Sequence, residues 1–195
     1  MTVKVPDIFP LPPNLPEPMD NGACDHLAGM RMPAVSLPST SGRTVNLAEL
    51  KTGRTAIYCY PMTGVPGRAL PVGWDAIPGA RGCTPQSCGF RDCFQEFSAL
   101  ETDLLGLSTQ TTDYQREMAE RLRLPFDVLS DAEFKFCEAL GLPTFEVEGM
   151  RLVKRLTLIV REGAIETVFY PVFPPDKSAE QVIQWLRKHP TNQGG

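Results

Sequence analysis

Two cysteines, Cys83 and Cys88, lie where a loop rich in glycine and proline is expected to give way to a helix, and they indicate thiol redox chemistry. A helix N-terminus carries about half a positive charge and several unpaired N–H donors, which together stabilise a thiolate over a thiol. Thr84 is the expected N-cap and Pro85 the expected first helical residue. We therefore expect Cys83 at the mouth of the helix, as a reactive thiol with a partner beside it.

The spacing of the pair argues against a permanent bridge. Five residues of continuous helix advance about 7.5 Å and turn about 500°, so the two side chains point apart. A disulfide needs Cα atoms within about 7 Å, so the pair joins only if the first helical turn unwinds. This suits a pair that alternates between reduced and bridged states. A structural disulfide is the alternative, and nothing in the sequence marks a secreted protein, where such bridges persist.

The other four cysteines are interpreted as unreactive or structural. Cys59 lies in an apolar strand and Cys137 in a helix beside phenylalanines, so both are expected to be buried, while Cys24 is expected to be free in an N-terminal arm. Cys83, Cys88 and Cys93 are evenly spaced, but steps of five rotate by about 140° on a helix, so the three do not converge on one ion. We expect no metal and no cofactor.

Bulk properties limit the class of protein. The 195 residues suffice for one domain, and the net charge of −4 with a pI near 5.3 argues against a nucleic-acid or anionic-membrane partner. The first residues lack the apolar run of a signal peptide, and no stretch reaches the roughly 18 apolar residues of a membrane span. These features predict a cytoplasmic protein.

The organisation along the chain predicts an arm followed by one α/β domain. Residues 1–33 contain seven prolines, which indicates an arm that is disordered or laid over the domain, and residues 34–190 form the domain. Residues 61–82 form a long aperiodic loop that leads into Cys83, for which we expect a functional role. The phenylalanines at 90, 94 and 97 define the buried face of one helix.

The other expected elements alternate between strands and helices, which predicts a layered α/β domain with a mixed sheet. Capping boxes are expected to open the helices at Ser130 and Ser178. The expected strands are 34–37, 44–47, 55–60, 103–108, 126–129, 152–160 and 165–170. The first expected helix begins after Thr84, and the other expected helices span 112–122, 130–141 and 178–189.

Arg155 stands out because it interrupts a strand that is otherwise mostly apolar. Lys154 and Arg155 point to opposite faces of a strand, so at least one charge points inward. An inward charge is costly unless it meets an anion, and a thiolate is the anion that this chain offers. The alternative is a surface arginine whose charged end reaches solvent.

With these residues in view, the chain from about Pro33 to His189 resembles the peroxiredoxins of the peroxiredoxin Q type, also called bacterioferritin comigratory proteins. The resemblance is carried by Tyr58-Cys59-Tyr60-Pro61, Gly82-Cys83-Thr84, Cys88-Gly89-Phe90-Arg91-Asp92, Leu129-Ser130-Asp131, and Arg155 with Thr157. It implies a thioredoxin-like fold with a central mixed sheet flanked by helices. It also implies that Cys83 is the peroxidatic cysteine, Cys88 the resolving cysteine and Arg155 the active-site arginine.

The sequence departs from the family pattern at one position of the site. The family usually carries a threonine or serine three residues before the reactive cysteine, where this chain has Ala80. Either the long loop returns another hydroxyl, with Thr63 as the nearest candidate, or the site works without one.

The resemblance implies a thiol-dependent peroxidase that reduces hydrogen peroxide and organic hydroperoxides. Thioredoxin or glutaredoxin would recycle it, and the chain would act as a monomer or homodimer. Two other functions stay open from the residues alone. One is a thioredoxin-like dithiol oxidoreductase, although the Cys-x-x-Cys typical of that class is absent. The other is an interaction protein whose Cys83–Cys88 bridge switches a binding face.

Overall fold

A five-stranded sheet in the order β5-β4-β3-β8-β9 forms the centre of the computed structural model, which describes residues 8–50 and 53–191. β4 runs parallel to β3 and β5, whereas β8 is antiparallel to β3 and β9. The strands are β3 (Arg54–Cys59), β4 (Thr102–Ser108), β5 (Val128–Ser130), β8 (Leu156–Arg161) and β9 (Ala164–Phe169). This is the mixed sheet that the sequence predicts.

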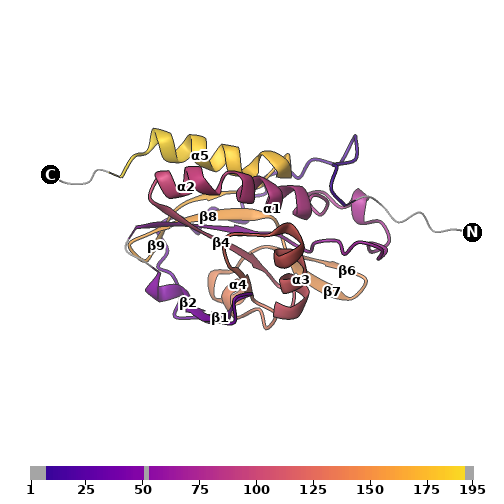
Figure 1. Cartoon of the computed structure of the whole chain (residues 1–195), viewed down its shortest axis with the longest axis horizontal. Coiled ribbons are helices and arrows are strands. Elements are labelled where there is room, and N and C mark those ends of the chain that lie inside the picture. The colour runs from indigo at the N-terminus through magenta and orange to yellow at the C-terminus, as the bar shows by residue number, and fades with distance from the viewer. Residues whose placement is uncertain (1–7, 51–52, 192–195) are drawn as a thin grey trace, which may run out of the picture.

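The two faces of β3 pack into different parts of the core, because successive side chains of a strand point to opposite faces. Tyr58 and Tyr60 pack on the side of α1 (Cys83–Asp92) and α5 (Ser178–Lys188). Ile57 and Cys59 pack on the opposite side, beneath β1 (Ser36–Pro38), β2 (Thr44–Asn46) and α4 (Lys135–Leu140). Figure 1 shows α1, α2 (Phe94–Ala99) and α5 over one face of the sheet, with β1, β2 and α4 on the other side.

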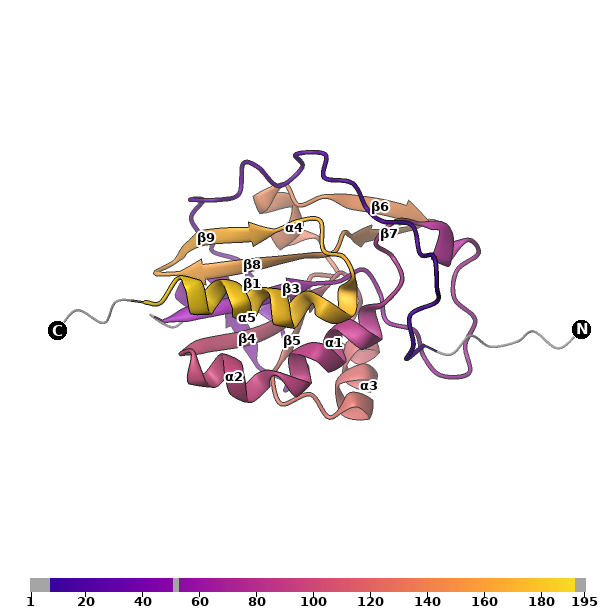
Figure 2. The same ribbon diagram turned by 90° about the horizontal axis from the view of Figure 1, so that it is seen from above.

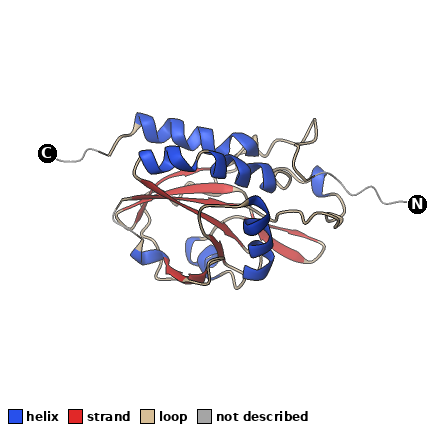
Figure 3. Ribbon diagram, in the orientation of Figure 1, coloured by secondary structure: helices blue, strands red, loops and turns tan. Residues whose placement is uncertain are grey.

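Several sequence predictions hold. The helix predicted at 112–122 is α3 (Thr112–Leu122), and its N-cap Thr111 accepts a hydrogen bond from the Tyr114 N–H. Cys59 and Cys137 are buried as expected. The loop at 61–82 contains only one short 3-10 helix, Trp74–Ala76, as Figure 3 shows.

The capping-box predictions are wrong. α4 begins at Lys135 rather than after Ser130. The Asp131 carboxylate, which precedes the helix in the chain, accepts hydrogen bonds from the N–H groups of Phe136 and Cys137 and so caps the first turn of α4. Ser178 is the first residue of α5 rather than its cap, and it directly follows a 3-10 turn at Pro175–Lys177. The N-cap residue of α5 is Lys177, whose side chain makes no capping hydrogen bond. The helix with the three phenylalanines is also not continuous, since Cys93 separates α1 from α2.

The strand predicted at 152–160 is two strands, and this correction concerns the site. β7 (Met150–Val153) pairs with β6 (Thr144–Val147), an unpredicted strand, in a separate hairpin, and β8 starts only at Leu156. Lys154 and Arg155 form the connection between the hairpin and the central sheet. Arg155 is therefore outside both strands, and the alternation argument for its direction does not apply.

The N-terminal segment is laid over the domain from Ile8 onward. Backbone hydrogen bonds join Gly29 and Met30 to Ile165, and Met32 to Gly163, along the edge strand β9. Leu27 is fully buried. In Figure 2 this segment, in dark violet, passes along the β9 side of the sheet toward the β6–β7 hairpin. Of the two forms expected for the arm, residues 8–33 adopt the laid-over one, and residues 1–7 lie outside the described residues.

Within residues 8–50 and 53–191, no helix is both long enough and apolar enough to span a bilayer.

Candidate active site around Cys83

Cys83 is the first residue of α1 rather than a residue before it. Gly82 is the N-cap and adopts φ +103°, a left-handed conformation that a glycine tolerates without strain. The predicted N-cap Thr84 is wrong, because the turn at Gly82 starts the helix two residues earlier. Cys83 remains in the first turn, where the N–H groups have no helical acceptor and the helix dipole is positive.

The Cys83 sulfur is buried and lies beside a cation. Arg155 Nη2 donates to Cys83 Sγ at 3.2 Å, and Sγ lies 3.5 Å from the Ala80 carbonyl oxygen, to which the thiol donates. Cys83 is 3 % exposed and Arg155 is also 3 % exposed, so little water screens the pair. The contact places a guanidinium N–H group directly against the sulfur, where no water intervenes.

The guanidinium of Arg155 is held in place by acceptors from the loop before α1. Nη2 also donates to the carbonyl oxygens of Ala80 and Arg81, both at 3.1 Å, and Nε donates to Gly79 O at 3.3 Å. Nη1 donates to Gln86 Oε1. These partners fix the plane of the fork and keep one N–H group directed at the sulfur, which is the arrangement of a preorganised electrostatic site.

A small cavity of about 10 Å³ opens at Cys83, which is room for about one water molecule. Its lining includes Ile8 from the arm, Trp74 and Arg81 from the loop, and Thr84 from the helix. The long loop and the arm thus cover the thiol together. Arg81 is a second cation at this cavity, and its Nη1 donates to Asp75 at 3.1 Å.

The hydroxyl expected from the loop is not in that lining. Thr63 is 1 % exposed, and its Oγ1 has no hydrogen-bond partner among the described residues. Its carbonyl oxygen accepts from Tyr114 Oη at 2.6 Å, but Thr63 is not among the residues that line the Cys83 cavity. Thr84 supplies the only hydroxyl side chain of that lining, and Ala80 is fully buried.

Cys88 lies on the same continuous helix and is half-buried. Burial raises the pKa of its thiol above the ordinary value, and the nearby Arg91 guanidinium opposes that shift. Both Cys83 and Cys88 are free thiols. Cys88 and Cys93 line a groove of about 350 Å³ between α1 and the start of α5. The structure thus shows the separated, reduced form of the pair, and a bridge requires local unwinding of α1, as the sequence predicts.

Sequence reasoning missed several residues that support the site. Gln86 is one helical turn after Cys83, and its Nε2 donates to Ser178 Oγ at 3.3 Å while its oxygen holds Arg155. The helical spacing of three from Cys83 is the signal that would have identified it. Tyr114 lies close to Cys83, and its pKa is raised by burial and then by the Cys83 charge.

No cluster of three or more histidine, cysteine or acidic side chains among the described residues is arranged to hold a metal ion. Cys24 is a free thiol, as expected, and it is buried in the same core cluster as Cys59 and Cys137.

Three comparisons relate this chain to known proteins. Residues 27–183 match the family model described as Redoxin. The chain is 31% identical to peroxiredoxin Bcp of Escherichia coli strain K12 over 166 residues, which are 83% of this chain and 96% of that protein. It superposes on the crystal structure of peroxidoxin BcpB from Mycobacterium tuberculosis with a TM-score of 0.68 and 26% identity, over 84% of this chain and 98% of that one. The bacterioferritin comigratory protein of Xanthomonas campestris, whose structure is described for its alkyl peroxide reduction, gives a TM-score of 0.67 and 20% identity, over 84% and 99% of the two chains.

Proposed function

The chain belongs to the redoxin family, as a peroxiredoxin of the Bcp and peroxiredoxin Q type, and on that premise we propose that Cys83 is its peroxidatic thiol, Cys88 its resolving thiol and Arg155 its active-site cation. As a member of this family, it is a thiol-dependent peroxidase with a thioredoxin-like fold. One observation carries the assignment of residues. A buried arginine from a distant connection donates to the sulfur of Cys83, in the first turn of a helix, at 3.2 Å.

In the first step, the Cys83 thiolate attacks the distal oxygen of a hydroperoxide and the O–O bond breaks. The sulfur becomes a sulfenic acid, and the leaving alkoxide or hydroxide takes a proton to become an alcohol or water. Arg155 stabilises the thiolate before attack, and it donates toward the oxygen on which negative charge develops. Because the cavity at Cys83 is small, alkyl hydroperoxides enter with displacement of the covering loop and arm.

In the second step, the first turns of α1 unwind and Cys88 approaches the oxidised sulfur. The Cys88 thiolate attacks the sulfenic sulfur, hydroxide leaves and takes a proton, and an intrachain disulfide forms. The helix geometry makes this unwinding obligatory. The left-handed Gly82, which has no capping side chain, leaves the start of α1 without the side-chain cap that would oppose such unwinding.

An external dithiol completes the cycle by reducing the disulfide, and thioredoxin or glutaredoxin are the reductants that we propose. Cys88 is the accessible sulfur of the pair, because it lines an open groove whereas Cys83 is buried. All three site residues come from one chain, so a monomer or a homodimer suffices. A reducing compartment such as the cytoplasm fits the need for a dithiol and the six free cysteines.

The test follows peroxide consumption over many turnovers with dithiothreitol as reductant. Cys83→Ser is expected to abolish turnover. In a parallel assay without added thiol, Cys88→Ser is expected to consume one equivalent of peroxide per chain and then to stall. Cys93→Ser is the matched control, since Cys93 lines the same groove as Cys88 but has no role in the cycle, and it is expected to keep full turnover.

Peptide masses identify the bridge directly. Cleavage after Arg81 and Arg91 releases residues 82–91, which hold both Cys83 and Cys88. One equivalent of peroxide is expected to remove two hydrogens from this peptide without linking it to another. Turnover that persists in Cys83→Ser, or a bridge that joins this peptide to the one containing Cys93, would contradict the assignment.

A further inference from the structure

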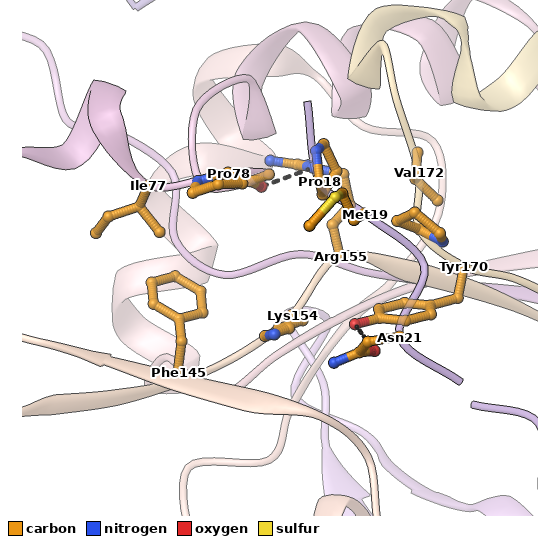
Figure 4. A pocket seen from close by; sticks show the side chains of 12 residues that line it. Pro18, Met19, Asn21, Ile77, Pro78, Phe145, Lys154, Arg155, Tyr170 and Val172 are labelled. Carbon is orange, nitrogen blue, oxygen red and sulfur yellow. Dashed lines mark hydrogen bonds between the residues drawn. The ribbon is translucent and has the colours of Figure 1, made fainter. Parts of the chain in front are cut away.

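A second and larger cavity, of about 300 Å³, is lined by Arg155 but not by Cys83 (Figure 4). Its walls come from five segments that are distant in sequence, among them residues 154–155 and 170–172. Pro18 and Met19 belong to the N-terminal arm, Ile77 and Pro78 to the loop before α1, and Phe145 to β6. Figure 4 shows these side chains around the opening, with Lys154 at its floor. The exposed surface of the cavity is mostly apolar.

One charge in this lining has no partner. The side chain of Lys154 lies in the cavity wall, and within the described part of the chain no carboxylate lies at salt-bridge distance from it. The other polar groups are already engaged. Tyr170 Oη donates to Asn21 Oδ1 at 3.1 Å, and the Arg155 fork is occupied by the loop carbonyls, Gln86 and Cys83. An unpaired ammonium in an apolar cavity attracts an anion, because pairing offsets its desolvation.

We propose that this cavity binds an amphiphilic carboxylate, with the carboxylate on the Lys154 ammonium and an apolar chain between the arm and Phe145. The volume of the cavity limits the length of the ligand's apolar chain. At about 30 Å³ per group, the liquid volume of one water, the cavity holds roughly ten non-hydrogen groups. A straight-chain acid of about ten carbons therefore matches both the volume and the charge.

One wall of the cavity lies outside the part of the chain that matches the family model. The redoxin match begins at residue 27, so Pro18, Met19 and Asn21 lie outside it, yet they form one wall. The arm that closes this wall is held to β9 by backbone hydrogen bonds from Gly29 onward.

The cavity also shares residues with the site at Cys83. Gly79 and Arg155 line it, and the same Gly79 carbonyl accepts from Arg155 Nε. The hydrocarbon chain of a ligand packed against Ile77, Pro78 and Gly79 therefore favours the loop position in which Arg155 faces the sulfur of Cys83. Because coupling between sites is reciprocal, oxidation of Cys83 with unwinding of α1 is expected to weaken carboxylate binding.

Titration calorimetry of the reduced full chain with decanoate tests the site, and peroxide is absent, so the result does not depend on the proposed catalytic cycle. We expect one site with a Kd of about 0.1 mM, in the range of a ligand of this size. Decanol, which has the same chain without the charge, is expected to bind at least tenfold more weakly. Lys154→Met, which keeps the apolar stem, is expected to weaken decanoate binding about tenfold or more and to leave decanol unchanged.

Lys188→Met is the matched control, since Lys188 is an exposed lysine at the end of α5, and it is expected to bind decanoate as the parent chain does. Ile77→Trp fills the cavity while it keeps Lys154, and it is expected to abolish binding of both ligands. The thermal melting temperature of each variant shows whether it is folded. Equal binding of decanoate and decanol, equal effects of the two lysine substitutions, or full binding by a folded Ile77→Trp variant would overturn the proposal.

Discussion

Replacing Arg155 by methionine tests whether a single buried cation activates Cys83. Methionine keeps the apolar stem but removes the fork that donates to Cys83 Sγ and to three loop carbonyls. The substitution belongs in a Cys88→Ser background, in which Cys83 forms a sulfenic acid and proceeds no further. The measured quantity is then the rate of the first step alone.

The expected magnitude follows from the geometry. Unit charges about 4 Å apart at an effective dielectric constant of about 20 interact by about 4 kcal/mol. Removal of one preorganised donor from an anion site typically costs about 2.7 to 4 kcal/mol in the barrier. Since about 1.4 kcal/mol corresponds to a factor of ten, we expect sulfenic acid formation to slow by about 100- to 1,000-fold. The carbonyl oxygens of Gly79, Ala80 and Arg81 also lose their donor, which destabilises the fold by about 2 to 4 kcal/mol.

The assay follows dimedone trapping of the Cys83 sulfenic acid by mass spectrometry, as a function of time after mixing with peroxide. Urea denaturation of each variant identifies conditions in which it is fully folded, and the rates are compared there. Arg155→Lys keeps the charge without the fork, so its rate is expected to lie between those of the parent chain and the methionine variant. Arg151→Met is the matched control, because Arg151 is a partly exposed arginine of β7 that donates to Glu138.

The reasoning fails if the folded Arg155→Met variant forms sulfenic acid within about threefold of the parent rate. It also fails if Arg151→Met slows the step as much as Arg155→Met does. A loss of stability without a loss of rate would show that Arg155 serves only to hold the loop.

Three further predictions concern two of the other thiols and the glycine at the N-cap of α1. Because burial raises the pKa of Cys88, its thiolate is the minor form at pH 7. Stopped-flow measurement of disulfide formation after a single oxidation is expected to show a rate that rises from pH 7 to pH 9 without levelling off, and a flat profile would contradict this. Burial raises the pKa of Cys24 to about 12, so iodoacetamide at pH 8 is expected to label Cys24 in the chain unfolded by urea but not in the native chain, as read from peptide masses. Gly82→Ala is expected to cost about 2 to 4 kcal/mol in urea denaturation, because the new Cβ is strained at φ +103° and meets Pro175 and Leu11. Gly42→Ala, at φ +82° with open space, is expected to cost about 1 kcal/mol, and equal costs would refute the steric argument.

Local signals in the sequence predicted the parts of the fold that depend on neighbouring residues. The apolar run at 55–60 predicted β3, and the helix predicted at 112–122 is α3 with the same bounds. Capping predictions failed where another group supplied the cap. Asp131 reaches forward to two N–H groups of α4, and Gly82 sets the start of α1 through its backbone conformation. Composition does not distinguish such arrangements, because several residues near a helix start are competent caps.

The candidate site also combines features that neighbouring residues determine with features that only distant contacts determine. Cys83 and Cys88 follow from residue type, spacing and the expected helix start. Arg155 was identified as unusual, but the reason given from strand alternation was wrong, since it lies in the connection between β7 and β8. Thr63 was expected near the thiol, but it does not line the cavity, although Met62 and Gly64 on either side of it do.

The amino-acid sequence by itself determined that two thiols lie together at the start of one helix, because helix formation and thiol spacing are local properties of about ten residues. Only the tertiary structure decided which cation contacts the first thiol, which segments cover that thiol and which cavity that cation also lines. Arg155 is 72 residues from Cys83 along the chain, and their contact exists because the β7–β8 connection and the loop at 77–82 pack against each other. Contacts of that range depend on the summed packing of many side chains, and no single motif specifies them.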